Sequence, residues 1–224
     1  MHTYPNMKTN YSLILLLFVK ICFAQNEVET IYKNQIKLSP VRLITTIRGI
    51  QLSYERQISG KLSTQLTASY IVDLLPYHFA DFTKMTGYSL GIEQKYFLGK
   101  TKIKRRYLSA DFTFLDSNFD MVHSFAYIPS GDSLRTFYSD TISVSRKTST
   151  LSIKYGVQYC LKHFVFEINA GIGIRYRDVT HTNKLHQDAV WERSREPNAL
   201  DELFSDGHYF TLNIPLGLKI GYRF

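Results

Sequence analysis

The sequence predicts an all-β protein, an eight-stranded antiparallel transmembrane up-and-down β-barrel that is preceded by a cleaved signal peptide. Three observations predict this fold. Apolar and polar residues alternate over segments of about ten positions, the connections between these segments are alternately short and long, and the chain begins with an export signal.

The N-terminus has the order of features that a secretory signal needs. Lys8 precedes the apolar run Leu13–Val19, and the small residue Ala24 stands before polar residues. We therefore expect residues 1–24 to be a signal peptide that is cut after Ala24. An uncleaved membrane anchor is the alternative, but the run is shorter than the roughly 20 residues of a spanning helix, and Lys20 interrupts it.

Charge and cysteine content restrict the function further. Cleavage removes Lys8 and Lys20 and no acid, so the net charge falls from +8 to +6. No helix face gathers these cations, and nucleic acid is not an expected partner. Only Cys160 remains after cleavage, so no internal disulfide can form. Cys22 lacks the small residues that precede a lipoprotein cysteine, which leaves a lipid anchor as a weak alternative.

The barrel is expected over residues 36–224, after a short periplasmic segment at 25–35. Alternation is clearest at the C-terminus, where almost every second residue from Phe210 to Phe224 is apolar. The two sets of a strand point to opposite faces of the sheet. Strands are predicted, in order, at 36–44, 50–58, 62–72, 88–98, 108–114, 151–161, 164–176 and 210–224.

Two prolines disturb this pattern. Pro40 lies in the first strand, which is also the least regular, and Pro215 lies in the last. Proline cannot donate to the ladder, so we expect a bulge or a missing hydrogen bond at Pro215.

The connections indicate which end of the barrel is which. Those at 59–61, 99–104 and 162–163 are short, whereas those at about 73–86, 116–147 and 178–207 are long. Outer-membrane barrels have tight periplasmic turns and extended extracellular loops. The pattern therefore predicts that both termini lie in the periplasm.

The polar face decides between a membrane barrel and a secreted lipocalin-like binding barrel, whose apolar face would point inward. It carries small residues and four charges of each sign: Glu55, Glu93, Asp111 and Glu167 against Lys95, Lys154, Arg175 and Lys219. Such a balance suits a narrow lumen in which buried ions pair, with glycines leaving room for the long side chains.

The apolar face is continuous along the strands and carries aromatic residues near its ends, among them Tyr176, Tyr222 and Phe224, as lipid-interface girdles do. We therefore expect the apolar face to point outward. Gln94 and Arg56 depart from it, although Arg56 lies near a turn, where its side chain can reach the headgroups.

These features resemble the small outer-membrane barrels of the OmpA and OmpX type. They resemble in particular an uncharacterised subfamily of eight-stranded barrels with a Leu-Ser-Tyr-Glu-Arg second strand, here Leu52–Arg56, and a Gly-Ile-Glu-Gln-Lys-Tyr-Phe fourth strand, here Gly91–Phe97. The resemblance covers nearly the whole mature chain. It implies that the C-terminal strand ending in Phe224 is recognised by the barrel assembly machinery.

No catalytic, cofactor or metal site is predicted, and the chain is not expected to be an enzyme. His181, His186, Asp188 and Glu192 share one long loop, which offers a metal ion no fixed geometry. Ser205 and His208 are the only pair that suggests the alternative of a lipid A-modifying enzyme.

The segment 116–147 is rich in large apolar residues, namely Phe119, Met121, Phe125, Tyr127, Ile128, Phe137 and Tyr138. A hairpin that extends the barrel explains them more simply than a partner site does.

The sequence thus predicts an integral protein of the cell outer membrane with a structural or surface-interaction role and no wide pore. The expected partners are outer-membrane lipids and lipopolysaccharide, the assembly machinery, and an extracellular partner at loops 116–147 and 178–207. A narrow channel is a further alternative.

Overall fold

The computed structural model describes residues 32–43, 49–71, 82–100, 103–127, 136–183, 185, 190–191 and 206–224. The predicted signal peptide lies outside these ranges. Over the described ranges the chain is all β apart from the 3₁₀ turn η1, Pro40–Leu43, and no helix there is long and apolar enough to cross a membrane.

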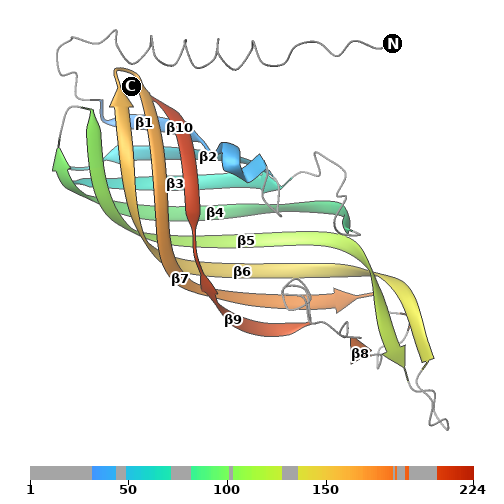
Figure 1. Ribbon diagram of the computed structural model, residues 1–224. Helices are drawn as coiled ribbons and strands as arrows, with labels where there is room; N and C mark the ends of the chain where they lie inside the picture. The colour runs from blue at the N-terminus through green and yellow to red at the C-terminus, as the bar shows by residue number, and fades with distance from the viewer. Residues whose placement is uncertain are drawn as a thin grey trace, which may run out of the picture.

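The strands form one closed antiparallel barrel (Figure 1). Its wall follows chain order, and β10 pairs with both β7 and β1, which closes the ring. β9 and β10 together make the eighth wall strand, so the predicted eight-stranded antiparallel barrel is confirmed. The wall strands are β1 Asn34–Leu38, β2 Gly49–Gln57, β3 Leu62–Ile71, β4 Phe82–Lys100, β5 Lys104–Tyr127, β6 Thr136–Leu161, β7 Phe164–Thr182, β9 Gly207–Asn213 and β10 Leu216–Arg223.

The short turns and the C-terminus lie at one end of the barrel, as predicted. The backbone N–H of Asn34 donates to the carbonyl of Phe224 over 3.1 Å, and that of Arg223 donates to His163 in the β6–β7 turn over 2.6 Å. The β2–β3 turn lies beside the last residues of β4 at the same end, where the N–H of Phe97 donates to the carbonyl of Lys61 over 2.8 Å. The long connections therefore all leave from the opposite end.

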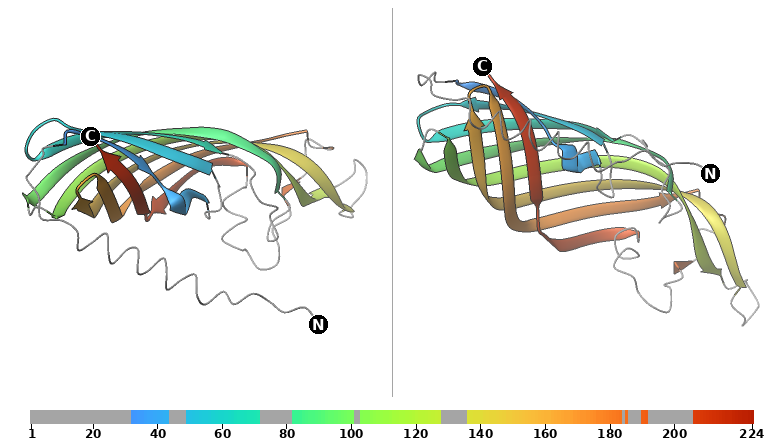
Figure 2. Two further views of the ribbon diagram at one scale, coloured as in Figure 1. Left: turned by 90° about the horizontal axis from the view of Figure 1, so that it is seen from above. Right: turned by 45° about the horizontal axis from the view of Figure 1, so that its top comes forward.

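The prediction of a loop at 116–147 is wrong, because β5 and β6 pair without interruption from Lys104↔Tyr159 to Tyr127↔Thr136. The hairpin interpretation is confirmed. Figures 1 and 2 show this hairpin reaching beyond the other strands and bending at its tip. The two-residue strand β8, Val190–Trp191, pairs with its β5 edge. The neighbouring connections are also shorter than predicted, since β4 begins at Phe82 and β7 ends at Thr182.

The prediction for the first strand is wrong beyond Leu38. β1 ends there, and Pro40 begins η1, in which the N–H of Arg42 donates to the Ser39 carbonyl over 3.2 Å. Proline has no N–H for the ladder and its fixed φ suits the start of a helical turn, so it ends the strand.

Pro215 interrupts the last strand without shifting it. Asn213 pairs with Gly173 and Leu216 with Ala170, which is one unbroken register, so there is no bulge. The carbonyl of Pro215 still accepts from the N–H of Gly171 over 3.0 Å. Of the two expected alternatives, the missing hydrogen bond is therefore confirmed.

Candidate functional site

Between the turn end and Asp116, the two faces of the barrel wall differ in polarity with few exceptions. Leucine, isoleucine and aromatic side chains from every wall strand point outward and are exposed, whereas lysines, glutamates, glutamines and serines point inward and are buried. A lipocalin-like barrel would have the opposite arrangement. The predicted orientation is confirmed, and the candidate functional site is the charged interior.

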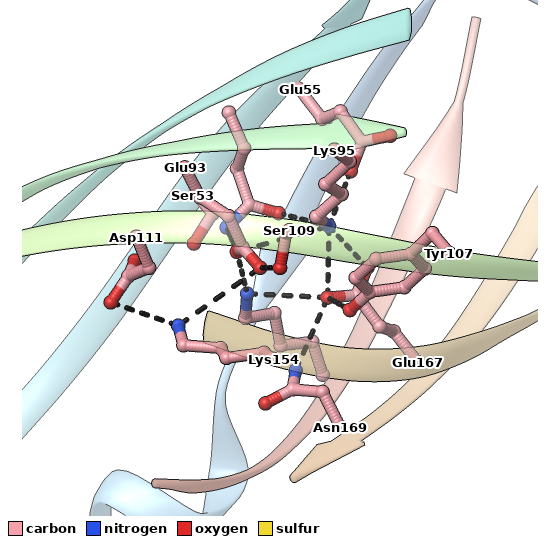
Figure 3. Close-up of polar contacts among 12 residues, drawn as sticks. Ser53, Glu55, Glu93, Lys95, Tyr107, Ser109, Asp111, Lys154, Glu167 and Asn169 are labelled. Carbon is pink, nitrogen blue, oxygen red and sulfur yellow. Dashed lines mark hydrogen bonds and ion pairs between the residues drawn. The ribbon is translucent and has the colours of Figure 1, made fainter. Parts of the chain in front are cut away.

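Glu167 on β7 is the centre of this interior (Figure 3). Its carboxylate accepts from Lys95 at 2.8 and 2.9 Å, lies 3.2 Å from the Nζ of Lys219, and also pairs with Lys37. The Tyr107 hydroxyl donates to it over 2.8 Å. Three cations from three strands thus converge on one carboxylate.

Two further glutamates complete the cluster. Glu55 pairs with Lys37 and accepts from Lys95 over 2.7 Å. Glu93 accepts from Lys219 over 3.1 Å and from the Ser109 hydroxyl over 2.7 Å. Each buried carboxylate therefore has at least one cation and a neutral donor, as burial of an ion requires.

Amide side chains connect the ions. Gln158 donates to Glu55 over 3.1 Å and to Glu167 over 2.8 Å. Gln65 donates to Glu93 over 3.1 Å while its oxygen accepts from Lys95 over 3.0 Å. The cluster is thus one continuous network across the lumen.

Seven of the eight predicted charges join this cluster or lie at its margin, where Lys154 pairs with Asp111 at 2.9 Å and is 4.0 Å from Glu93. Arg175 lies apart and donates to Asn213. The sequence reasoning missed Lys37, because it lies in the short irregular strand before Pro40. With Lys37 the cluster holds four lysines and four acids, which are Lys37, Lys95, Lys154, Lys219, Glu55, Glu93, Asp111 and Glu167.

Glycines make room for these side chains, as predicted. A Cβ on Gly156 would lie 2.2 Å from the ring of Tyr107, and one on Gly221 would lie 2.6 Å from Cγ of Lys37. The Tyr107 ring lies across the bare backbone of the neighbouring strand and thereby reaches Glu167.

Gly156→Val is therefore expected to displace Tyr107 and to lower the free energy of unfolding by about 1–3 kcal/mol. Urea titration of the folded protein in lipid vesicles measures it. Ala110→Val adds methyl groups to the exposed outer face of β5 and is the control. Equal stability of the two variants would contradict the packing role of Gly156.

The pair at the margin of the cluster permits a double-mutant cycle. Asp111→Leu or Lys154→Met alone leaves a partly buried charge without its nearest partner, at a cost of about 2 kcal/mol each. The double variant is expected to be about 1 kcal/mol more stable than the sum of the two effects. Strict additivity in the same urea titration would show that the pair contributes nothing.

The outer apolar surface is a band with two borders. On β4 it runs from Tyr88 to Leu98, which matches the roughly 9–11 residues of a transmembrane strand. At the border away from the turns, one cross-strand row is charged or titratable. It consists of Asp116, Lys147, Asp178 and His208, which pair in sequence across β5, β6, β7 and β9.

Aromatic side chains lie near both borders. Tyr222 and Phe224 are exposed at the turn end, and Tyr176 lies at the other end, where it packs against Phe210 with ring centroids 4.9 Å apart. Gln94 is satisfied within the band, because its oxygen accepts from the hydroxyl of Thr64 over 2.7 Å. Arg56 lies close to the β2–β3 turn, as predicted.

Beyond this charged row, on the side away from the turns, the outer face of the wall becomes polar and the inner face becomes apolar. Asp116, Asn118 and Asp120 of β5 point outward, whereas Phe119 and Phe125 point inward into an apolar cluster. Met121 joins this cluster, and Tyr138 packs against it. Phe137 is exposed, and Ile128 lies outside the described residues. The aromatic content predicted for this segment thus belongs largely to a second core.

The other candidate residues are not brought together by the structure. His181 lies at the end of β7, while His186, Asp188, Glu192 and Ser205 lie outside the described residues. In the part of the chain that is described, no three His, Cys, Asp or Glu side chains are arranged to hold a metal ion. His208 lies on the outer face, 3.4 Å from Asp178 and 3.2 Å from the Tyr176 hydroxyl.

The fold and the site together define a closed eight-stranded barrel with an apolar outer surface and an ion-paired interior. No family model matches this sequence, and no curated protein matches it. The function is therefore inferred from the geometry of the barrel itself.

Proposed function

We propose that the protein is an integral outer-membrane β-barrel of a Gram-negative bacterium, of the OmpA and OmpX type, with a structural or surface-interaction role. The observation that carries this proposal is the polarity of the wall, which is apolar where it would meet lipid and charged inside. In water an exposed apolar band of this extent would drive aggregation. In a bilayer the same band is stabilising, and closure leaves few backbone groups unpaired.

The interior argues against a wide pore. The ion-pair network spans the lumen, and Phe97, Tyr107 and Val165 are completely buried toward the turn end. A hydrated ion would have to separate buried pairs in order to pass, which is costly. We expect planar bilayers containing the protein to show no single-channel conductance, and a conductance would instead support the narrow channel.

The proposed location is tested by fractionation. The outer-membrane fraction of cells that express the full chain is run on a denaturing gel with and without boiling. A closed barrel keeps its fold in detergent and migrates differently until it is boiled. A band in this fraction that shifts on heating supports the proposal, whereas a soluble protein with no shift contradicts it. The signal peptide is tested on the same material, because cleavage after Ala24 would leave Gln25 as the first residue.

The extracellular connections, among them the β5–β6 hairpin, and the C-terminal strand ending in Phe224 would then supply the partner-binding functions. The hairpin would face the cell exterior and the C-terminal strand would face the assembly machinery. The short turns and the C-terminus at one end of the barrel support both assignments, because outer-membrane barrels have their short turns in the periplasm.

A lipid A-modifying enzyme is a second candidate, because His208 lies beside Asp178 at the border of the apolar band. A carboxylate that orients a histidine is one part of a hydrolytic site. The test is the mass spectrum of lipid A from three kinds of cell, which express the wild-type protein, the Ser205→Ala variant or the His208→Ala variant. Lipid A that is identical in all three would exclude the enzyme.

A further inference from the structure

Cations gather at the end of the barrel that carries the short turns. The described residues with exposed or half-buried basic side chains there are Lys33 before β1, Arg56 near the end of β2, Lys61 in the β2–β3 turn, Lys104 and Arg106 at the start of β5, and Lys162 in the β6–β7 turn. Apart from the C-terminal carboxylate of Phe224, the described outer face and turns of this end carry no anion. The neighbouring Glu55 points into the lumen, where it pairs with Lys37 and Lys95.

Four of these cations have no acid beside them. In the ranges that the structure describes, no ion pair joins Lys33, Arg56, Lys61 or Arg106 to a carboxylate. The backbone carbonyls of Lys33 and Lys61 accept hydrogen bonds from β2 and β4, each over 2.8 Å, which fixes both residues at the edge of the wall. All four side chains are exposed, so their charges are available to an anionic ligand.

Two of the four cations lie on the outer face of the wall, next to the apolar band. Arg56 shares the outer face of β2 with Tyr54, and Arg106 shares the outer face of β5 with Leu108. An arginine at the edge of an apolar surface can lay its hydrocarbon stem along that surface and extend its guanidinium to the headgroups. A lipid headgroup would lie beside these two arginines in a bilayer, whereas a soluble acidic protein would have to displace lipid to reach them.

The opposite border of the band has no such excess of cations. Its cross-strand row alternates acids and bases, in the order Asp116, Lys147, Asp178 and His208. Beyond this row Lys84 and Asp120 pair at 3.3 Å. The described outward charges are therefore basic at the turn end and mixed at the other end, which favours an anionic ligand at the turn end.

We propose that the turn end of the barrel binds anionic phospholipid through Lys33, Arg56, Lys61 and Arg106. The inference rests on the proposed function, because headgroups lie at this border only if the apolar band is in a bilayer. In the proposed orientation the turn end lies in the periplasmic leaflet, which consists of phospholipid. The phosphates accept from the guanidinium groups of Arg56 and Arg106, and the acyl chains lie along the apolar band. Each cation near an anionic membrane surface strengthens such binding about fivefold.

The test uses the full chain in nanodiscs of phosphatidylethanolamine with a minority of phosphatidylglycerol. Native mass spectrometry of the released protein measures the ratio of the two lipids that it retains. The wild-type protein is expected to retain phosphatidylglycerol in excess of its share of the nanodisc. The double variant Arg56→Gln/Arg106→Gln is expected to lower this excess about fivefold or more, because it removes the two cations nearest to the band.

Lys84→Gln/Lys147→Gln is the matched control, because it removes two exposed cations of the outer face at the opposite end. It should leave the excess of phosphatidylglycerol unchanged. Equal losses in the two double variants would overturn the site. An unchanged excess in Arg56→Gln/Arg106→Gln would also overturn it, and is the result expected if these cations bind an acidic protein instead.

A heat-shifted band is the first check on every variant, and it separates failure of this inference from failure of the proposed function. A wild-type protein that shifts but retains phosphatidylglycerol only in proportion to its share overturns the lipid-binding surface alone. A protein without a shift overturns the membrane barrel.

Discussion

Glu167→Ala is expected to lower the free energy of unfolding by about 3–5 kcal/mol, because it leaves buried lysines without their shared carboxylate. Lys37, Lys95 and Lys219 all contact Glu167, and Lys37 and Lys95 are completely buried. Neither cation can turn toward water without opening the barrel. The loss is measured by urea titration of the protein in lipid vesicles, with the unheated gel band as the measure of folded protein.

Two further variants serve as comparisons for the stability that Glu167→Ala loses. Glu167→Gln keeps the size of the side chain and one acceptor oxygen, so its loss should lie between those of wild type and Glu167→Ala. Lys84→Ala removes an exposed ion pair with Asp120, whose atoms are 3.3 Å apart, and should cost less than about 1 kcal/mol. If Glu167→Ala costs no more than Lys84→Ala, the interior ions are not paired as described.

Ile172→Lys is expected to destabilise the protein by about 2–4 kcal/mol in a bilayer, because it places a cation on the lipid-facing side of β7 near the middle of the band. The Ile172 side chain is 59% exposed. In a water-soluble protein a lysine at such a position would be tolerated without measurable cost. The same urea titration in vesicles therefore distinguishes lipid from water outside the barrel.

Ile58→Lys is the control for this substitution. Ile58 is 60% exposed, almost the same as Ile172, but it lies in the β2–β3 turn at the edge of the band. A lysine there can reach the headgroups, so the cost should be about 0–1 kcal/mol. Equal costs at the two positions would contradict a bilayer around the band.

Alternation was sufficient to predict the face on which each wall residue lies. The period of a strand is two, so a residue such as Glu167 or Glu55 is assigned to the lumen as soon as its neighbours are assigned to the outside. The same reasoning could not predict which ions meet. Lys37 and Glu167 are 130 residues apart, and their contact depends on the strand stagger around the closed ring, which alternation does not specify.

The ends of the strands were predicted less well, for two physical reasons. Past Asp116 the outward face becomes polar and the inward face apolar, and this exchange resembles the end of a membrane strand in the sequence although pairing continues. At the start of the barrel, Pro40 ends β1 at Leu38, so the true length of the first strand could not be predicted from the pattern of apolar residues.

The most direct test of the lipid-facing outer wall is a nitroxide scan of residues 151–157 of β6, with Cys160→Ala as the background and the protein in lipid vesicles. We expect labels at Leu151, Ile153 and Tyr155 to be relaxed by oxygen dissolved in the bilayer and to be protected from a water-soluble nickel chelate. Labels at Ser152 and Lys154, which point into the lumen, should be poorly accessible to both. Outward labels that the nickel chelate relaxes strongly would place water at the apolar face and contradict the membrane barrel.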